Sequence, residues 1–101
     1  MKLLIVTSVK EFHDKALRLL KKAKIESFSG SEIEGYKNAE ALLMTNDWFS
    51  SKAAGIESSV FFSFTEDDKI ELMFDLIKEF NKTIETNNPI RAVVVPIEKY
   101  I

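Results

Sequence analysis

The spacing of apolar residues changes along the chain, and these changes divide it into segments of two kinds. Four segments have the pattern of strands: residues 3–9, 26–36, 58–64 and 91–101. The first is a short run of branched apolar residues, typical of a buried strand. The second is polar, which predicts that one of its faces meets water or another subunit. The third, "SSVFFSF", places Val60, Phe62 and Phe64 on one alternation, and in the fourth Pro96 indicates a strand end or an edge strand.

Two other segments follow the helical period. In residues 10–25, apolar side chains recur at helical spacing, with acids near the start and lysines near the end, as the helix dipole favours. These apolar residues are Phe12, Ala16, Leu19, Leu20 and Ala23. In residues 65–84, Thr65 is the predicted N-cap, with Asp68 three residues later as the acid of a capping box. The apolar stripe of this second helix consists of Ile70, Met73, Phe74, Ile77, Phe80 and Ile84.

The predicted order is strand, helix, strand, strand, helix, strand, which is the βαββαβ pattern of the ferredoxin-like fold. We therefore expect an α+β protein with a single domain over residues 1–101, an antiparallel sheet, and both helices on one face of it. The first and last strands carry apolar residues on both alternations, for example Leu3 and Leu4, or Val93 and Val94. A bare sheet face with apolar side chains needs a cover, and another copy of the same chain is the simplest one. This pattern predicts a homo-oligomer.

The connection between the second and third strands, residues 37–57, is longer than a hairpin needs. Loops of this length are usually functional or disordered. The segment "NAEALLM" predicts a short helix over residues 39–45. Three interpretations stay open: a satellite core folded onto its own domain, a loop that contacts a partner or caps a ligand, and disorder. The candidate partner-binding residues are Leu42, Leu43, Met44, Trp48 and Phe49.

Several stretches resemble the PII signalling family, the nitrogen regulatory protein P-II or GlnB-like proteins. The segment "KIESFSGSEIEGY" resembles the strand that leads into that family's T-loop, and residues 37–57 take the place of the T-loop at nearly the same length. "TEDDKIELMFDLI" resembles the start of the family's second helix, and "VVVPIEK" its final strand. The resemblance covers nearly the whole chain and is that of a divergent, PII-like member.

The resemblance implies a ferredoxin-like trimer whose sheets face the centre. It also implies a regulatory protein and not an enzyme, with an effector such as ATP or ADP in the clefts between subunits. The T-loop would contact a partner protein. On this basis the candidate effector-binding residues are Ser29, Ser31, Gly35, Tyr36, Asn38, Phe62, Phe64 and Arg91.

Differences between this sequence and the family's phosphate-binding residues affect which effector we expect. The family holds nucleotide phosphates with a Gly-Asp-Gly-Lys loop before the last strand, and here "TNNPIR" takes its place. Pro89 removes one backbone N–H from this loop, whereas Arg91 supplies a charge in place of the lysine. The arginines that follow the family's last strand have no counterpart up to Ile101. These departures argue against ordinary ATP binding and leave an adenine nucleotide as one candidate effector among several. The CutA family shares the trimeric fold, so a ligand-free assembly module whose apolar loop serves only oligomerisation is the alternative.

Composition narrows the function classes further. The net charge of −2 predicts no bulk attraction to nucleic acid, and the opening apolar run is too short to span a membrane, so we expect a cytoplasmic protein without membrane insertion. There is no cysteine, and the one histidine, His13, follows an apolar helix position and is expected at the surface or the boundary of the core. Glu32, Glu34 and Tyr36 share one face of the second strand, but one histidine and no cysteine leave no metal-ligand pattern. A small enzyme using Glu32 or His13 is a third, less favoured alternative.

Overall fold

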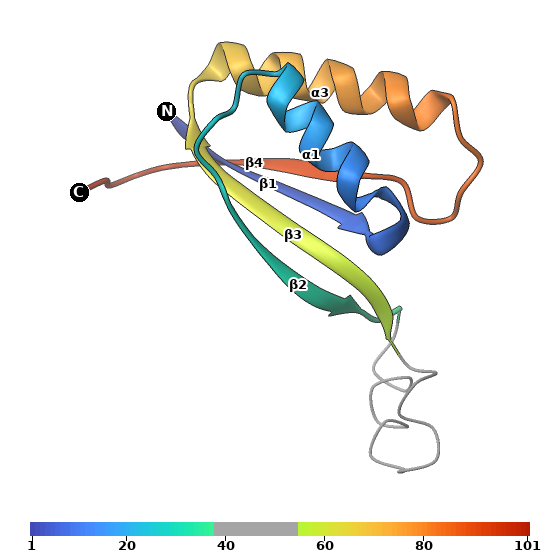
Figure 1. Cartoon of the computed structure of the whole chain (residues 1–101). Helices are drawn as coiled ribbons and strands as arrows, with labels where there is room; N and C mark the ends of the chain where they lie inside the picture. Colours follow the sequence, from blue (N-terminus) through green and yellow to red (C-terminus); the bar gives the residue numbers. More distant parts are fainter. Residues whose placement is uncertain (38–54) are drawn as a thin grey trace.

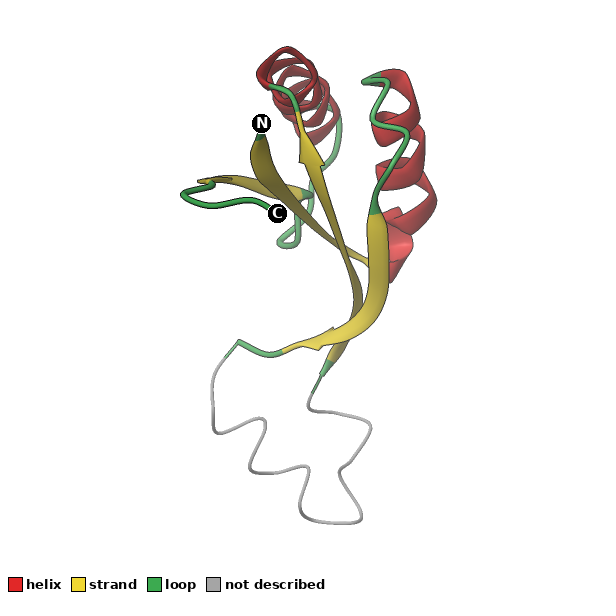
Figure 2. Cartoon of the chain, turned by 90° about the vertical axis from the view of Figure 1, so that its left-hand side faces the viewer, coloured by secondary structure: helices red, strands yellow, loops and turns green. Residues whose placement is uncertain are grey.

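The computed structural model describes residues 1–37 and 55–101. The chain runs through β1 (Lys2–Val9), the 3-10 turn η1 (Lys10–Phe12), α1 (His13–Lys22), β2 (Ser29–Gly35), β3 (Ile56–Thr65), α3 (Asp67–Lys82) and β4 (Arg91–Pro96). The four strands form one antiparallel sheet in the order β2-β3-β1-β4. Both helices cover one face of the sheet and leave the other open (Figure 1, Figure 2). The predicted α+β, ferredoxin-like order of elements is confirmed.

The predicted boundaries need several corrections. The segment 10–25 is not one helix, because a 3-10 turn precedes α1, which ends at Lys22. β2 covers Ser29–Gly35 within the predicted 26–36, and β3 begins at Ile56, two residues before the predicted start. β4 ends at Pro96, so the strand predicted over residues 91–101 is too long. Proline lacks the N–H that a ladder needs, which agrees with its expected place at a strand end.

Thr65 is not the cap of the second helix. It is the last residue of β3, and Glu66 occupies the N-cap position without a side-chain capping hydrogen bond. The acids of the first turn, Asp67 and Asp68, still lie where the helix dipole favours negative charge. Strand pairing extends through Thr65, which pairs with Lys2, so the tertiary ladder overrides the local capping signal.

The end of α1 is closed by two backbone hydrogen bonds. Lys24 adopts a positive φ of 61°, its N–H donates to the carbonyl of Lys21 at 3.0 Å, and the N–H of Ile25 donates to the carbonyl of Leu20 at 3.0 Å. This is the Schellman arrangement, which usually has glycine at the left-handed position. The turn sends the chain from α1 toward β2 and buries Ile25 in the core.

The hydrophobic core lies between the helices and one face of the sheet. The sheet contributes Leu4, Val6 and Phe61, and the helices contribute the buried part of each predicted apolar stripe. The buried helix residues are Ala16, Leu19 and Leu20 of α1 and Ile70, Met73 and Ile77 of α3. Phe12, Phe74 and Phe80 pack at the rim of this core, where the rings of Phe12 and Phe80 meet edge to face at 5.5 Å.

The ends of β2 and β3 run past the end of β1 as a two-stranded ribbon. β1 pairs with β3 only as far as Val9 and Ser58, whereas β2 continues to pair with β3 as far as Gly35 and Ile56 (Figure 1). We call these paired ends, residues 34–35 and 56–57, the arm. The arm leads directly into the connection between β2 and β3, so its direction sets where that connection leaves the domain.

Candidate functional site

The open face of the sheet is an apolar surface made mainly by β1, β3 and β4. The register aligns Leu3 of β1 with Phe64 of β3 and Val95 of β4, and the next row aligns Ile5, Phe62 and Val93. Four of these side chains are notably exposed: Phe62 by 41%, Phe64 by 48%, Val93 by 53% and Val95 by 40%. The predicted alternation of Val60, Phe62 and Phe64 is therefore confirmed, and its face is the one that the helices leave uncovered.

This face is extended by the end of the chain. The ring of Tyr100 lies 5.9 Å from the ring of Phe64, and Phe64 in turn meets Phe62 edge to face at 6.3 Å. Tyr100 itself is 66% exposed. The residues after β4 thus turn back onto the open face and add an aromatic side chain to it.

Arg91 is the one charged strand residue on the open face of the described sheet. It is exposed, and it pairs across β4 and β1 with Thr7, in the row that continues through Val60 to Ser31. The charged residues of β2 and β3 all have the opposite parity and face the helix side: Glu32, Glu34 and Glu57. The open face therefore combines apolar side chains with a single positive charge at one edge.

The backbone before Arg91 is held by α3. The side chain of Asn81 donates to the carbonyl oxygen of Ile90 at 2.9 Å and accepts from the N–H of Ile90 at 3.2 Å. Ile90 is buried, so these two bonds satisfy backbone groups that water does not reach. The end of α3 thereby fixes the position at which β4 and Arg91 begin.

The predicted effector residues divide between two edges of the sheet. Ser29, Ser31 and Gly35 lie on β2, at one edge, whereas Arg91 lies on β4, at the other. Three strand spacings of about 4.8 Å separate the two edge strands, roughly 14 Å. Phe62 and Phe64 lie on β3, beside β2, with Phe62 directly opposite Ser29. Within one chain, therefore, the serines and the arginine do not meet.

Tyr36 follows β2 at the base of the long connection. Its hydroxyl donates a hydrogen bond to the Glu34 carboxylate, and this bond, with smaller contributions from burial and from the negative charge, raises the pKa of Tyr36 above its ordinary value. A Cβ atom on Gly55 would come within 2.9 Å of the Glu34 carboxylate and 3.2 Å of the Tyr36 ring. The two ends of the connection are therefore packed closely where they join the arm.

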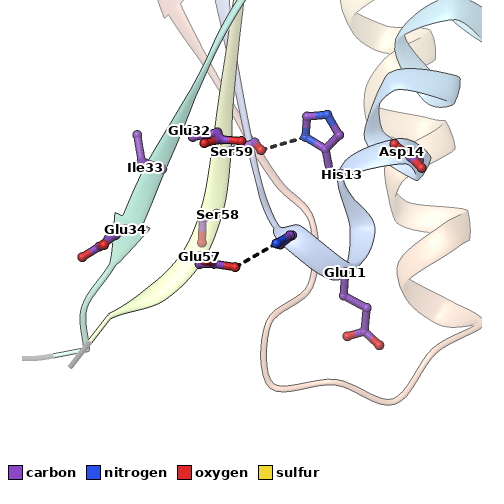
Figure 3. Close-up of a pocket in the computed structure, with 10 residues that line it drawn as sticks. Glu11, His13, Asp14, Glu32, Ile33, Glu34, Glu57, Ser58 and Ser59 are labelled. Atoms are coloured by element: carbon purple, nitrogen blue, oxygen red, sulfur yellow. Dashed lines mark hydrogen bonds and ion pairs between the residues drawn. The ribbon is translucent and has the colours of Figure 1, made fainter. Parts of the chain in front are cut away.

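The helix side of the β2–β3 ribbon holds a cleft that the sequence did not predict. It lies between the start of α1 and the β2–β3 ribbon, with a volume of about 590 Å³ (Figure 3). The cleft is lined by Lys10, Glu11, His13, Asp14, Glu32, Ile33, Glu34, Glu57, Ser58 and Ser59. The shared parity of Glu32 and Glu34 was visible in the sequence, but the approach of η1 and α1 to this face is a product of the fold.

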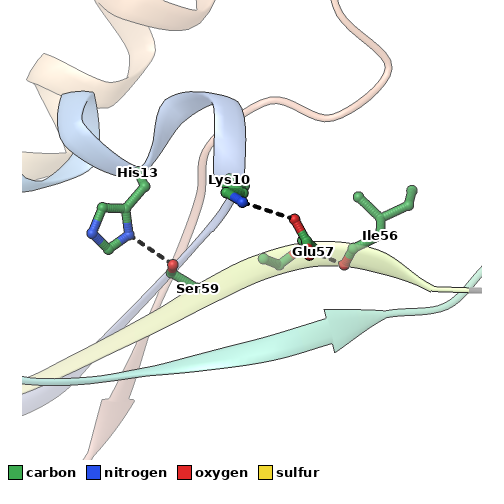
Figure 4. A network of polar contacts seen from close by, with 6 residues as sticks. Lys10, His13, Ile56, Glu57 and Ser59 are labelled. Carbon is green, nitrogen blue, oxygen red and sulfur yellow. Dashed lines mark hydrogen bonds and ion pairs between the residues drawn. The ribbon is translucent and has the colours of Figure 1, made fainter. Parts of the chain in front are cut away.

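Two polar contacts cross this cleft. His13 Nδ1 lies 2.8 Å from Ser59 Oγ, and Lys10 Nζ lies 3.2 Å from Glu57 Oε2 (Figure 4). The His13 ring also packs on the ring of Phe61 at 5.4 Å. His13 is half-buried, as its expected boundary position requires. Both contacts join the start of the helical layer to the β3 strand close to the arm.

Other predictions have a limited outcome. Asn38, the helix predicted over residues 39–45, and the candidate partner residues Leu42, Leu43, Met44, Trp48 and Phe49 lie outside the described residues. Within residues 1–37 and 55–101, no three His, Asp or Glu side chains are arranged to hold a metal ion. In the same part of the chain, no helix has the length and apolar character to cross a membrane.

Comparison with known proteins defines the fold. No protein-family model matches the chain, and no curated protein sequence matches it. Among solved structures, the fold is similar to that of CPII, a nitrogen regulatory PII-like protein from Thiomonas intermedia K12 whose structure was determined with ADP, AMP and bicarbonate bound. The TM-score is 0.61 over 99% of this chain and 94% of that one, at 9% sequence identity. The chain therefore has a PII-like fold.

Proposed function

We propose that this protein is a PII-like regulatory protein that works as a trimer and not as an enzyme. In this proposal an effector binds in the clefts between subunits, and the connection over residues 37–57 contacts a partner protein. The observation that carries the proposal is the open sheet face. Phe62, Phe64, Val93 and Val95 leave an apolar surface that a monomer would expose to water, and further copies of the chain would cover it.

The candidate effector-binding residues lie at two opposite edges of the sheet, and this supports binding of the effector between two subunits. Ser29 and Ser31 lie on the β2 edge, and Arg91 lies on the β4 edge. An assembly that places the β2 edge of one subunit beside the β4 edge of another would bring hydroxyl groups and a guanidinium to one ligand. A single chain cannot do so, because two strands intervene.

The charge of this cleft favours a small anion over a polyphosphate. Each subunit contributes one guanidinium from its strands to the open face, and the three carboxylates of β2 and β3 lie on the other side. A charge that becomes enclosed by assembly requires a partner of opposite sign. One arginine with neighbouring hydroxyls suits a ligand with one or two negative charges, such as bicarbonate or a nucleoside monophosphate, better than ATP.

Light scattering and thermal unfolding with a panel of ATP, ADP, AMP, cyclic AMP, bicarbonate and divalent metals test the proposal. We expect the mass of a trimer and a melting temperature that rises with the concentration of one anionic ligand, because that ligand binds only the folded state. The rise should disappear in Arg91→Met. Arg18→Met is the matched control, since Arg18 is the chain's other arginine and lies exposed on α1. A monomer at all concentrations would refute the proposed assembly, and a rise that persists in Arg91→Met would refute the proposed ligand site.

The same measurements distinguish the regulatory protein from the alternative, a ligand-free assembly module. That protein would form an oligomer but show no shift with any ligand, and Trp48→Ala would dissociate it. In the regulatory protein, Trp48→Ala would keep the oligomer intact and weaken capture of the partner. Unchanged capture of the partner by the folded Trp48→Ala variant would refute the role of the connection.

A further inference from the structure

One row of polar residues crosses the helix side of the sheet beneath the start of α1. Ser8 of β1 pairs with Ser59 of β3, and Ser59 pairs with Glu32 of β2. Ser8 and Ser59 are buried, whereas Glu32 is exposed at the sheet edge. Cβ atoms of directly opposite residues lie about 4.5–5.5 Å apart, so rotation of their side chains brings neighbouring oxygens within hydrogen-bond reach. Ser59 occupies the middle of this row.

The hydroxyl group of Ser59 can donate only one hydrogen bond at a time. When His13 Nδ1 carries no proton, Ser59 donates to it across the 2.8 Å contact. When both ring nitrogens are protonated, Nδ1–H donates to Ser59 Oγ, and the hydroxyl proton of Ser59 is free to turn elsewhere. Two acceptors stand beside it in the row: the Glu32 carboxylate and the buried Ser8 Oγ, which has no hydrogen-bond partner among the described residues. A buried hydroxyl without a hydrogen-bond partner destabilises the folded state, and Ser8 Oγ is free to accept a hydrogen bond from a neighbour in this row.

The cleft around the His13 ring is lined mainly by acidic side chains. The groups that face the cleft from η1, α1, β2 and β3 are Lys10, Glu11, Asp14, Glu32, Glu34 and Glu57. Lys10 is paired with Glu57, which leaves carboxylates in excess around the ring. Glu32 lies on β2, across the cleft from α1, whereas the carboxylate of Glu34 is directed away from His13 and accepts a hydrogen bond from Tyr36 (Figure 3). A positive charge on His13 therefore attracts the β2 side of the ribbon toward the helix.

We propose that this row is a proton-operated latch, in which the neutral His13 ring carries its proton on Nε2, and protonation of Nδ1 reverses the His13–Ser59 hydrogen bond and links α1 through Ser59 to Glu32. The reversal joins a positive ring, a hydroxyl and a carboxylate in one charge-assisted chain. The arm is the part that responds, because a two-stranded ribbon beyond the sheet has few contacts to hold it in place. Acidification, which protonates histidine side chains, therefore closes the latch. The latch depends on neither the proposed assembly nor the proposed effector, so it can be tested independently of the proposed function.

A distance measurement between α1 and the arm tests the latch. The chain has no cysteine, so Lys21→Cys on α1 and Lys37→Cys beyond β2 give two unique positions for nitroxide labels. Distances between the labels are measured by pulsed electron paramagnetic resonance at about pH 8 and about pH 5.5. Diluting the labelled protein into unlabelled protein ensures that the distances lie within one chain. We expect the distance distribution to shift to shorter values at the lower pH.

Two variants assign the shift to the latch. His13→Asn keeps a neutral hydrogen-bonding group near the Nδ1 position, and Glu32→Gln removes the carboxylate from an exposed site, so the second should fold even if the first does not. Each should abolish the shift, whereas Glu71→Gln on the exposed side of α3 should retain it. Equal distances at the two pH values in the parent protein, or an unchanged shift in Glu32→Gln, would overturn the proposal.

Discussion

Replacing Phe62 with alanine should weaken association of the subunits without unfolding them. Phe62 is 41% exposed in the centre of the open face, and a phenylalanine side chain offers roughly 200 Å² in all. Complete coverage by another copy would therefore bury roughly 80 Å² more, which stabilises the interface by about 2 kcal/mol at about 25 cal/mol per Å². A loss of about 2 kcal/mol weakens association by about 30-fold at each interface.

Sedimentation velocity over a dilution series measures this effect as a shift of the midpoint of dissociation to higher protein concentration. Leu72→Ala is the matched control, because Leu72 is 42% exposed but lies on α3, on the side away from the open face. Far-ultraviolet circular dichroism establishes that both variants keep their fold. An equal shift in both variants, or no shift in Phe62→Ala, would refute the open face as the contact between subunits.

Two further substitutions test how the sheet and its edges are held. Gly30→Ala should lower the free energy of unfolding by about 1–3 kcal/mol in a denaturant titration, because the new Cβ would lie 2.8 Å from the Phe61 ring. Gly35→Ala is its control and should cost less, since the nearest atom there lies 3.5 Å away; equal losses would contradict the steric reasoning. Asn81→Ala should cost about 1–3 kcal/mol, because both backbone groups of buried Ile90 lose their partner. Hydrogen exchange at the Ile90 amide should then accelerate, and unchanged protection would show that Asn81 does not hold this strand.

The sequence predicted the open face well and the helix-side cleft poorly. Strand alternation is local, so Phe62 and Phe64 could be assigned to one face before any tertiary contact was known. The cleft depends on the contacts of His13 with Ser59 and of Lys10 with Glu57, which join residues 46 or more positions apart. No local period reports such contacts. The cap at Thr65 failed for the same reason, since pairing with Lys2 drew that residue into β3.

The amino-acid sequence by itself determined the order of helices and strands, the alternation of side chains along β2 and β3, and the place of the long connection between β2 and β3. It could do so because the periods of 2 and 3.6 residues express which side of each element is buried. Only the tertiary structure decided which strands are neighbours, and therefore that Ser31 and Arg91 lie at opposite edges of the sheet. It also decided that α1 begins against β3, because the register of the ladder and the packing of helices on the sheet arise from contacts between residues distant in the chain.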